Sequence, residues 1–445
     1  MTTDGVNLRE LALYVLLAVT KEKEHSHIVL AAVLDKYQYI TKQERSFITR
    51  LCEGTLERLI ELDYIIGQFS SVKIHKMKPV IRCILQMGVY QLKYMDSVPA
   101  SAACNEAVKL AGKTGFQNLK GFVNGVLRNI SRNLDTISYP DETEHPIEAL
   151  SVRYSMPEWI LQQWSSDYGL QKAKAIAEAF LGEGRTAVRT NQMRTSPEQL
   201  KEALNSRGIA AERVVLDEYP DFDYAMYLSG YDYLSAVEEF TDGQFMVQDV
   251  SSMLAAHIAA PKPGDYVIDI CAAPGAKSLH AAELMRGKGM VEARDLTGYK
   301  IGLIEENIAR SGLCNIHAVQ QDARILDEAS LEKADVVLAD LPCSGLGVLR
   351  KKPEIRYRMT REKERELVLL QREILSVACR YVKPGGTLLY STCTIDRMEN
   401  EENTRWFLER YPYFSLDAER QFFPDEGELD GFYIAKMIST KGCVG

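Results

Sequence analysis

Apolar residues recur every three to four positions through most of the first 138 residues, which is the spacing of amphipathic helices. The pattern predicts helices over Leu8–Val19, Glu44–Phe69, Pro79–Lys93, Ser101–Ala111 and Leu119–Ile130. The tract 96–101 contains Asp, Ser and Pro and interrupts the pattern before the fourth of these helices. We therefore expect residues 1–138 to form an all-α domain.

A polar, proline-containing stretch over residues 136–149 predicts a linker, after which the pattern becomes mixed. Two helices (157–168 and 171–180), a strand (186–190), a helix (196–206) and β-rich sequence up to residue 227 follow in turn. This order predicts a small α+β module over residues 150–240. We interpret Arg189 and Asn191 as ordinary strand-end and loop residues rather than as nucleic-acid contacts.

In residues 241–445, short β-branched runs alternate with helical segments, which is typical of an open parallel α/β sheet. Strands are predicted over Tyr266–Asp269, Met290–Asp295, Asn315–Asp322, Ala334–Asp340 and Gly385–Cys393, with a later strand over Gly431–Met437. Helices are predicted over Ser278–Met285, Tyr299–Arg310, Arg361–Val382 and Glu399–Tyr411. We therefore expect the third domain to have a Rossmann-like α/β fold.

A turn of mostly small residues joins the first of these strands to its helix, and it comprises Cys271, Ala272, Ala273, Pro274, Gly275, Ala276 and Lys277. Small side chains let a ligand approach the backbone, and the helix N-terminus presents free N–H groups. Asp295 ends the next strand, where an acid is placed to bind ribose hydroxyls. The turn lacks the Gly-x-Gly-x-x-Gly spacing of dinucleotide sites, which argues against an NAD-dependent dehydrogenase.

The length of 445 residues favours two or three domains. No run of 18 or more apolar residues is present, so no membrane span is predicted. Nine cysteines are dispersed without Cys-x-x-Cys pairs, which favours reduced thiols over disulfides or a metal site. We therefore expect a cytoplasmic protein that binds no metal.

The net charge of −9 is unevenly distributed along the chain. From Lys73 to Arg132 there are ten Lys and Arg residues and two acids, so this segment carries a net charge of +8. A polyanion needs a local basic face rather than a basic average, and the segment predicts nucleic-acid binding. A solvated helical surface is the alternative interpretation.

Three reactive side chains are predicted at the ends of neighbouring strands: Asp340, Cys343 and Cys393. The carboxyl ends of parallel strands meet at one edge of a sheet, so these groups should lie near the 271–277 turn. A thiolate, a carboxyl group and a bound adenosyl group together suit methylation of carbon 5 of a pyrimidine. The thiolate adds to carbon 6 and makes carbon 5 nucleophilic, the carboxyl group stabilises the adduct, and a second thiol could assist release.

Five motifs follow one another in this half: Gln248-Asp249-Val-Ser-Ser, Cys271-Ala-Ala-Pro-Gly-Ala-Lys277, Asp340-Leu-Pro-Cys-Ser-Gly345, Tyr390-Ser-Thr-Cys393-Thr and Asp430-Gly-Phe-Tyr. The set resembles the RNA 5-methylcytosine methyltransferase family. The resemblance implies a methyltransferase sheet with an antiparallel last strand, and S-adenosylmethionine as cofactor. The resemblance implies that residues 271–277 bind the cofactor, with Asp295 on its ribose and Asp322 near its adenine. It implies that Asp340 contacts the methionine end or the target base. It also implies that Cys393 is the attacking nucleophile and that Cys343 helps to release the product.

Residue chemistry alone leaves the choice between the two cysteines open. DNA cytosine methyltransferases attack with the Pro-Cys thiol, which corresponds to Cys343, whereas the RNA family uses the later cysteine, so the resemblance implies Cys393. We interpret Lys277 as a cofactor or substrate contact. We interpret Glu399 as an acid at a helix N-terminus and Lys300 as a helix-surface residue.

The N-terminal region resembles the NusB family of all-helical RNA-binding modules over Arg45–Arg50, Gly54–Arg58 and Lys120–Arg128. The two resemblances together imply a monomeric enzyme of the branch that methylates small-subunit (16S) ribosomal RNA. The same chemistry on transfer RNA is one alternative, and a non-catalytic ribosomal RNA-binding assembly factor is another. The helical region could also be a generic bundle that docks a partner.

Overall fold

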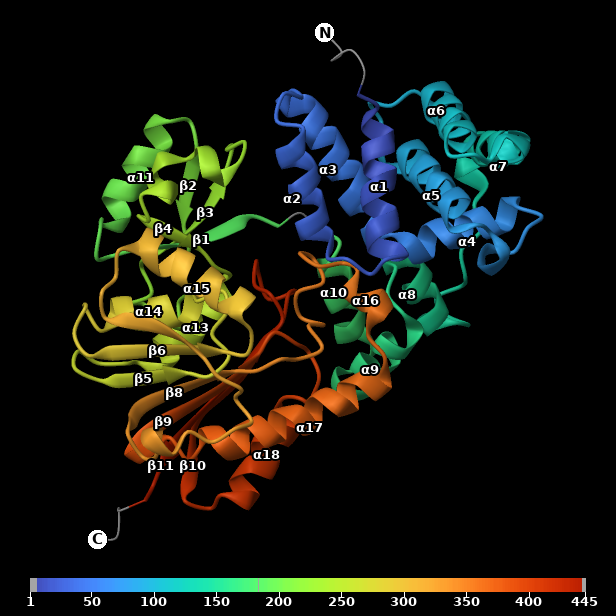
Figure 1. The fold of residues 1–445 in the computed structure, drawn as a ribbon. Coiled ribbons are helices and arrows are strands. Elements are labelled where there is room, and N and C mark those ends of the chain that lie inside the picture. Colours follow the sequence, from blue (N-terminus) through green and yellow to red (C-terminus); the bar gives the residue numbers. More distant parts are fainter. Residues whose placement is uncertain (1–5, 183, 442–445) are drawn as a thin grey trace. The chain divides into compact units, whose positions relative to one another are not determined.

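The computed structural model describes residues 6–182 and 184–441, and the first and third predicted domains each extend a few residues beyond this part. It divides into two compact units, which are coloured along the chain in Figure 1. Unit 1 comprises Met1–Gly182 together with Leu349–Arg358, and unit 2 comprises Glu183–Val348 together with Met359–Gly445.

Unit 1 is all-helical, which confirms the predicted class of the N-terminal region. Its helices are α1 (Leu8–Thr20), α2 (Ser26–Lys36), α3 (Lys42–Glu57), α4 (Leu59–Phe69), α5 (Pro79–Tyr94), α6 (Ala100–Lys113), α7 (Lys120–Arg132), α8 (Pro146–Tyr154), α9 (Glu158–Tyr168), α10 (Leu170–Ala179) and α16 (Ile355–Arg358). Three details differ from the sequence prediction. The predicted helix 44–69 is broken at Arg58, helix α2 was not predicted, and α8 begins inside the predicted linker.

The segment Leu349–Arg358 belongs to unit 1 although it is distant in sequence from the other helices. Glu354 is buried and accepts hydrogen bonds from the backbone N–H (3.1 Å) and the hydroxyl (2.7 Å) of Ser26. Arg356 is fully buried and donates to the carbonyl oxygen of Leu349 at 3.1 Å. Burial of two charged side chains requires such partners, so this segment has a defined place in the helical unit.

Unit 2 begins with a four-stranded antiparallel sheet in the order β2-β3-β1-β4. Its strands are β1 (Thr186–Thr190), β2 (Ala210–Arg213), β3 (Ala225–Ser229) and β4 (Phe245–Val247), accompanied by α11 (Pro197–Ser206) and α12 (Glu238–Thr241). Helix α11 starts at a capping box, in which Ser196 and Gln199 each bond the other's backbone N–H. The predicted α+β class is confirmed, although α9 and α10 belong to unit 1.

The second sheet of unit 2 has seven strands in the order β10-β11-β9-β8-β5-β6-β7. The strands are β5 (Tyr266–Asp269), β6 (Met290–Asp295), β7 (Ile316–Gln320), β8 (Ala334–Asp340), β9 (Val382–Thr392), β10 (Phe414–Phe422) and β11 (Phe432–Ser439). The helices are α13 (Val250–Ala259), α14 (Ala276–Leu284), α15 (Gly298–Ser311), α17 (Arg361–Ala378) and α18 (Glu401–Arg410). Strands β5 to β9 are parallel, and β11 inserts antiparallel between β9 and β10, as expected for this fold.

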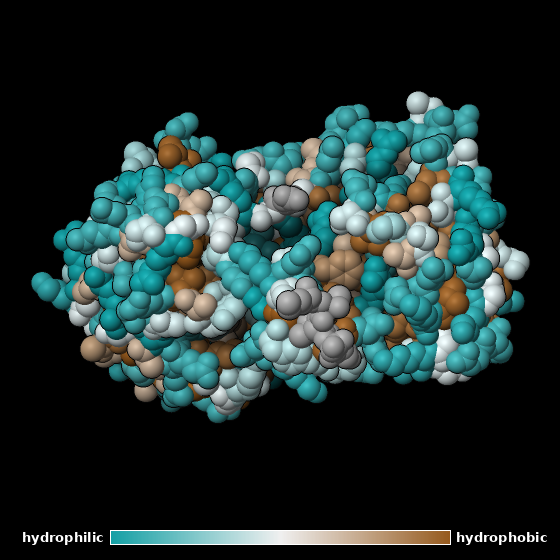
Figure 2. Space-filling view, turned by 90° about the horizontal axis from the view of Figure 1, so that it is seen from above, coloured by the Kyte–Doolittle hydropathy of each residue, from teal (hydrophilic) through white to brown (hydrophobic). Residues whose placement is uncertain are grey.

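The core strands of this sheet are apolar on both faces because helices cover them. Val267 and Ile268 of β5, for example, have no exposed surface. Hydrophilic residues cover most of the face of the molecule seen in Figure 2, with apolar residues in small groups. Among the described residues, no helix combines the length and the apolar character needed to cross a membrane.

Candidate active site

Five parallel strands of unit 2 place their carboxyl ends along one edge of the seven-stranded sheet. Four of the predicted site residues lie at or just beyond these ends: Asp295 on β6, Asp340 and Cys343 after β8, and Cys393 after β9. The turn 271–277 follows β5 at the same edge. The topology therefore brings together the groups that the sequence had separated by more than one hundred residues.

The 271–277 turn is hydrogen-bonded to the end of the following strand, β6. The carboxylate of Asp295 accepts the backbone N–H of Ala273 (3.0 Å) and the ammonium of Lys300 (2.9 Å). Lys300 is exposed on helix α15, as predicted, and it is also an ion-pair partner of the predicted ribose-binding acid. Gly275 has φ +103°, a conformation that favours glycine, and places the N-terminus of α14 next to the turn.

Two further acids surround this turn. Asp269 is buried and accepts the hydroxyl of Ser278 at 2.6 Å; burial raises the pKa of this carboxyl group to about 7. Asp322 follows β7, and its carboxylate accepts two hydrogen bonds from the Arg324 guanidinium, at 3.0 and 2.6 Å. This pairing lowers the pKa of Asp322. Asp322 is therefore already paired at the position where the family resemblance expects the adenine.

Arg189 and Asn191 lie at the end of β1 and just after it, as predicted, and both are buried. The Arg189 guanidinium forms a two-point ion pair with Glu283 (2.9 and 3.0 Å) and donates to the carbonyl oxygen of Ala276 at 3.0 Å. Asn191 donates to two backbone carbonyls, those of Gly243 and Ser311. Arg189 thus fastens the small sheet to the 271–277 turn, a role that no sequence pattern indicated.

Lys277 and Asp340 form an ion pair at the centre of the edge, with Nζ and Oδ2 2.6 Å apart. The other carboxylate oxygen of Asp340 accepts the hydroxyl of Ser391 at 2.8 Å. Burial is the largest single influence on the pKa of Lys277 and lowers it. The charge and hydrogen bond of Asp340, with smaller contributions from Asp269 and Cys393, together make the net direction upward. The Lys277 ammonium also lies 5.3 Å from the centre of the Phe432 ring, within cation–π range.

The sulfur atoms of Cys343 and Cys393 are 3.3 Å apart, and both residues are half-buried. The hydrogen bond to Cys393 and then burial raise the pKa of Cys343 well above its usual range. The charge of Cys393 is one of the groups that raise the pKa of Lys277. Lys277 therefore interacts with Cys393, while the charge of Glu399 is among the groups that raise the pKa of Cys343.

The two cysteine segments and the segment before β11 are in backbone contact. The N–H of Gly347 donates to the carbonyl of Cys393 (3.0 Å), and the N–H of Gly431 donates to the carbonyl of Gly347 (2.8 Å). A Cβ atom on Gly347 would lie 1.8 Å from the Gly431 carbonyl oxygen, so only glycine fits this approach. The motif 430–433 therefore supports both cysteine segments.

Glu399 was interpreted as an acid at a helix N-terminus, and it lies two residues before α18 begins and is fully buried. Its carboxylate accepts the backbone N–H of Ser344 and the side-chain amide of Gln371. Neither Glu399 nor Gln371 was identified as part of the site from the sequence, because both occur in helical patterns of ordinary appearance.

The residues of the 271–277 turn fit S-adenosylmethionine by their chemistry. The turn offers backbone N–H groups and small side chains, Asp295 can accept ribose hydroxyls, and Asp269 and Asp340 suit a ligand that carries a positive charge. Cys271 is part of this turn, and burial raises the pKa of its thiol, so it stays neutral. Within residues 6–182 and 184–441, no cluster of three His, Cys, Asp or Glu side chains could hold a metal ion.

The basic segment of unit 1 is partly neutralised in the folded structure. Four of its ten basic residues pair with carboxylates, in the pairs Arg82–Asp63, Lys93–Glu61, Lys109–Glu106 and Lys113–Glu10. The other six make no ion pair within the described part of the chain: Lys73, Lys76, Lys78, Lys120, Arg128 and Arg132. The cationic surface is therefore smaller than the charge of +8 indicates.

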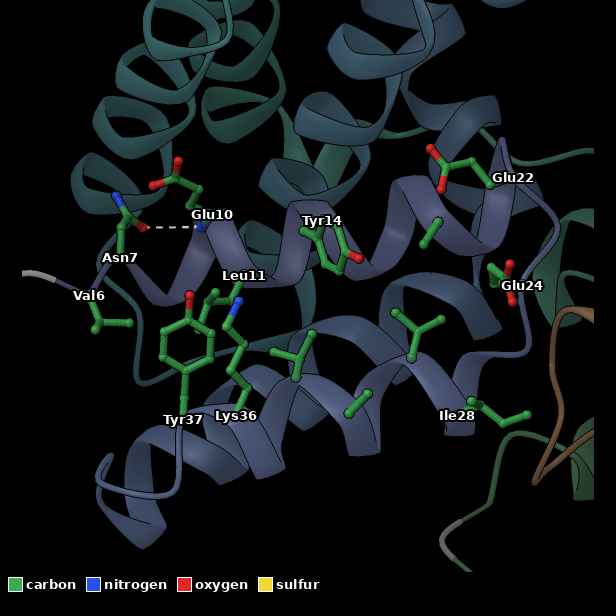
Figure 3. Close-up of a pocket in the computed structure, with 14 residues that line it drawn as sticks. Val6, Asn7, Glu10, Leu11, Tyr14, Glu22, Glu24, Ile28, Lys36 and Tyr37 are labelled. Carbon is green, nitrogen blue, oxygen red and sulfur yellow. Dashed lines mark hydrogen bonds between the residues drawn. The ribbon is translucent and has the colours of Figure 1, made fainter.

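A pocket of about 600 Å³ lies between α1 and α2 of unit 1 (Figure 3). Lys36 and Tyr37 extend from the end of α2 toward α1, and Glu10, Tyr14 and Glu22 line the α1 side. The lining contains no cysteine or histidine. The pocket thus lacks the two thiols that the predicted reaction requires.

Three family models match successive parts of the chain. The NusB family matches residues 6–132, a ferredoxin-like domain of RsmF/B-like methyltransferases matches 156–219, and the family described as 16S rRNA methyltransferase RsmB/F matches 256–438. Their order agrees with the all-helical, α+β and α/β regions described above.

Relatives match over nearly the whole chain. The probable ribosomal RNA small subunit methyltransferase B of Bacillus subtilis is 36% identical, covering 97% of this chain and 98% of that protein. The corresponding protein of Synechocystis is 30% identical, covering 97% of this chain and 99% of that protein. Among solved structures, that of PH0851 has a TM-score of 0.82 and 25% identity, covering 97% of this chain and 99% of that one.

Proposed function

Because the chain belongs to the ribosomal RNA small subunit methyltransferase B family, whose members depend on S-adenosylmethionine, we propose that it methylates carbon 5 of a cytidine in small-subunit ribosomal RNA. The observation that carries the proposal is the 3.3 Å pair of Cys343 and Cys393 beside the Lys277–Asp340 ion pair. A nucleophilic thiol, a second thiol and a carboxylate are the groups that this chemistry requires.

The cofactor, when bound at the 271–277 turn, supplies the methyl group as an electrophilic sulfonium. The Cys393 thiolate adds to carbon 6 of the cytosine, and the electron pair of the carbon 5–carbon 6 double bond then makes carbon 5 nucleophilic. Carbon 5 would then bond the methyl group while the bond between that methyl group and the sulfonium sulfur breaks, and the electron pair of the broken bond would stay on the sulfur. Lys277 stabilises the thiolate before attack. Asp340, which pairs with Lys277, is the proposed hydrogen-bond partner of the base and stabiliser of the adduct.

Cys343 is the proposed base for product release. While Cys393 is bonded to carbon 6, it can no longer hydrogen-bond Cys343 or carry a charge, so the two influences of Cys393 that raise the pKa of Cys343 are removed. Cys343 then ionises by losing its proton to solvent and takes the proton from carbon 5. The carbon 5–hydrogen electron pair restores the double bond, the carbon 6–sulfur bond breaks, and Cys393 leaves as a thiolate.

The target base must leave its stack to reach a half-buried thiol, so single-stranded or looped RNA is the expected substrate. The unpaired basic residues of unit 1, such as Lys73 and Arg128, are the proposed phosphate contacts. We place the reaction in the cytoplasm, where ribosomal RNA is assembled, and we treat the enzyme as a monomer.

The test uses radiolabelled S-adenosylmethionine, unmodified small-subunit ribosomal RNA, and the wild type, Cys393→Ser and Cys343→Ser proteins. Digestion to nucleosides should yield labelled 5-methylcytidine with the wild type and none with Cys393→Ser. Cys343→Ser should accumulate a covalent protein–RNA complex that survives denaturing electrophoresis. The reverse pattern would exchange the roles of the cysteines, and label in transfer RNA alone would refute the substrate assignment.

A further inference from the structure

The two peptide groups that flank Cys343 are both held by side chains from elsewhere in unit 2. On the C-terminal side, the Ser344 N–H donates to the Glu399 carboxylate, at 3.0 Å to Oε2 and 3.3 Å to Oε1. On the N-terminal side, the Pro342 carbonyl accepts the side-chain amide of Gln371 at 2.9 Å. The same Gln371 amide donates to Glu399 Oε2 at 2.7 Å, so the two contacts form one connected pair.

The Glu399–Gln371 pair is itself fixed by the core of the domain. The other amide atom of Gln371, Oε1, accepts from Asn403 on α18 at 2.8 Å. Tyr390 on β9 donates its hydroxyl to the backbone carbonyl of Glu399. Glu399, Gln371 and Asn403 each have no exposed surface. The pair can therefore hold the Cys343 loop at a defined distance from Cys393.

Burial raises the pKa of Glu399, whereas the hydrogen bonds that its carboxylate accepts oppose this rise and favour the ionised form. Its two hydrogen-bond partners, the Ser344 N–H and the Gln371 amide, are both donors, and a carboxylate only accepts. The charged and titratable groups that affect Cys343 are Cys393 from the β9 side and Glu399 from behind the loop, with Tyr390 next to both.

We propose that Glu399, together with Gln371, is a positioning residue that holds the Cys343 loop against Cys393 and places a negative charge behind the Cys343 thiol. The negative charge keeps the proton on Cys343, so the thiolate of the pair forms on Cys393. The same charge makes Cys343 a stronger proton acceptor during release. This inference rests on the proposed function, because it assigns a reason for the different roles of the two cysteines.

The first test removes the charge with Glu399→Gln, and Glu402→Gln on the exposed side of α18 is the matched control. Turnover should fall roughly tenfold or more for Glu399→Gln, and the covalent protein–RNA complex should accumulate because release is slowed. If Glu399 only stabilised the fold, Glu399→Gln would lower turnover without accumulation of the complex. Equal behaviour of the two variants would overturn the proposal.

The second test removes the other contact with Gln371→Met, which leaves the charge of Glu399 in place. This variant should also accumulate the complex, and it keeps the proposal testable if Glu399→Gln does not fold. The rate at which Cys343 is alkylated separates the effect of the charge of Glu399 from its effect on the position of the loop. In a Cys393→Ser background, iodoacetamide should label Cys343 several-fold faster at pH 8 when Glu399→Gln is added, because the thiolate is no longer repelled, and Gln371→Met should change this rate little.

Cys343→Ser separates the proposed release role of Cys343 from the proposed positioning role of Glu399. If it accumulates the complex and neither Glu399→Gln nor Gln371→Met does, the role of Cys343 stands and the positioning role of Glu399 is refuted. If Cys343→Ser accumulates no complex but Glu399→Gln still accelerates alkylation of Cys343, the release step is refuted while the electrostatic role of Glu399 stands. Unchanged alkylation would refute the electrostatic role.

Discussion

The surroundings of Cys343 and Cys393 differ although the two sulfur atoms are only 3.3 Å apart. Cys393 lies near the ammonium of Lys277, whose interaction with the thiolate raises the pKa of the lysine. The Cys343 loop is backed by Glu399, and the charges of Glu399 and Asp396 both raise the pKa of the nearby Glu364. The Cys393 thiol thus interacts with the ammonium of Lys277, and the Cys343 thiol interacts with the carboxyl group of Glu399.

This difference shows how one pair of identical side chains can perform two tasks. A nearby cation stabilises a thiolate and favours attack, whereas a nearby carboxylate favours the protonated thiol. The strand order brings the two cysteines together, but residues from α14, α17 and the segment before α18 distinguish them. Three changes would test the comparison, in decreasing order of expected effect.

The largest effect is expected from Lys277→Met, which removes the cation from the Cys393 side. Turnover should fall on the order of a hundredfold, and its pH dependence should move to higher pH because the thiolate loses its stabilising charge. Steady-state rates between pH 6 and 9.5 measure both. Lys300→Met, which removes the cation paired with Asp295, is the matched control, and it should weaken cofactor binding without this pH shift. An equal pH shift in both variants would contradict the comparison.

A smaller effect, roughly tenfold to hundredfold on turnover, is expected from Asp340→Asn. This change removes the carboxylate that contributes most to raising the pKa of Lys277, so that pKa should fall, and it also removes the proposed stabiliser of the adduct. Ser391→Ala removes the other partner of Asp340 without changing charge and should cost less. Single-turnover rates with saturating cofactor separate these steps from binding. A larger loss with Ser391→Ala than with Asp340→Asn would indicate that the loss arises from altered structure.

The smallest effect concerns stability on the acidic side. Burial raises the pKa of Glu364 to about 9, and neither carboxyl oxygen has a hydrogen-bond partner within the described residues. An ordinary glutamate in the unfolded chain ionises near pH 4.3. Ionisation therefore favours unfolding between these values, and the free energy of unfolding falls as pH rises through this range. Glu364→Gln should be more stable than the wild type by on the order of 1–2 kcal/mol at pH 8.

Urea unfolding at pH 5 and pH 8 checks this expectation, because the difference between the wild type and Glu364→Gln should be larger at pH 8. Glu366→Gln, on the exposed face of the same helix, provides the control and should show no such difference. A difference that does not change with pH would mean that Glu364 is not ionising across this range. The effect of burial and of the neighbouring carboxylates on the pKa of Glu364 would then be smaller than a pKa of about 9 requires.

The contrast between unit 1 and unit 2 shows how far periodicity alone can be used. The strands Met290–Asp295 and Ala334–Asp340 were predicted with the bounds that the structure has, because a buried parallel strand is a short apolar run that ends at a polar residue. In unit 1, the break at Arg58 and helix α2 were not predicted. Residues 42–69 keep a helical pattern across the break, so periodicity could not reveal it.

The amino-acid sequence by itself determined the three fold classes, the order of the motifs and the candidate groups Cys271–Lys277, Asp295, Asp340, Cys343 and Cys393. These are local properties, since each depends on residues within one strand or turn. Only the tertiary structure decided which side chains meet. The pairs Lys277–Asp340, Arg189–Glu283 and Glu399–Ser344 join residues 55 to 94 positions apart, and such contacts depend on the order of the strands and on burial. For the same reason, the surroundings that distinguish the two cysteines could be seen only in the folded chain.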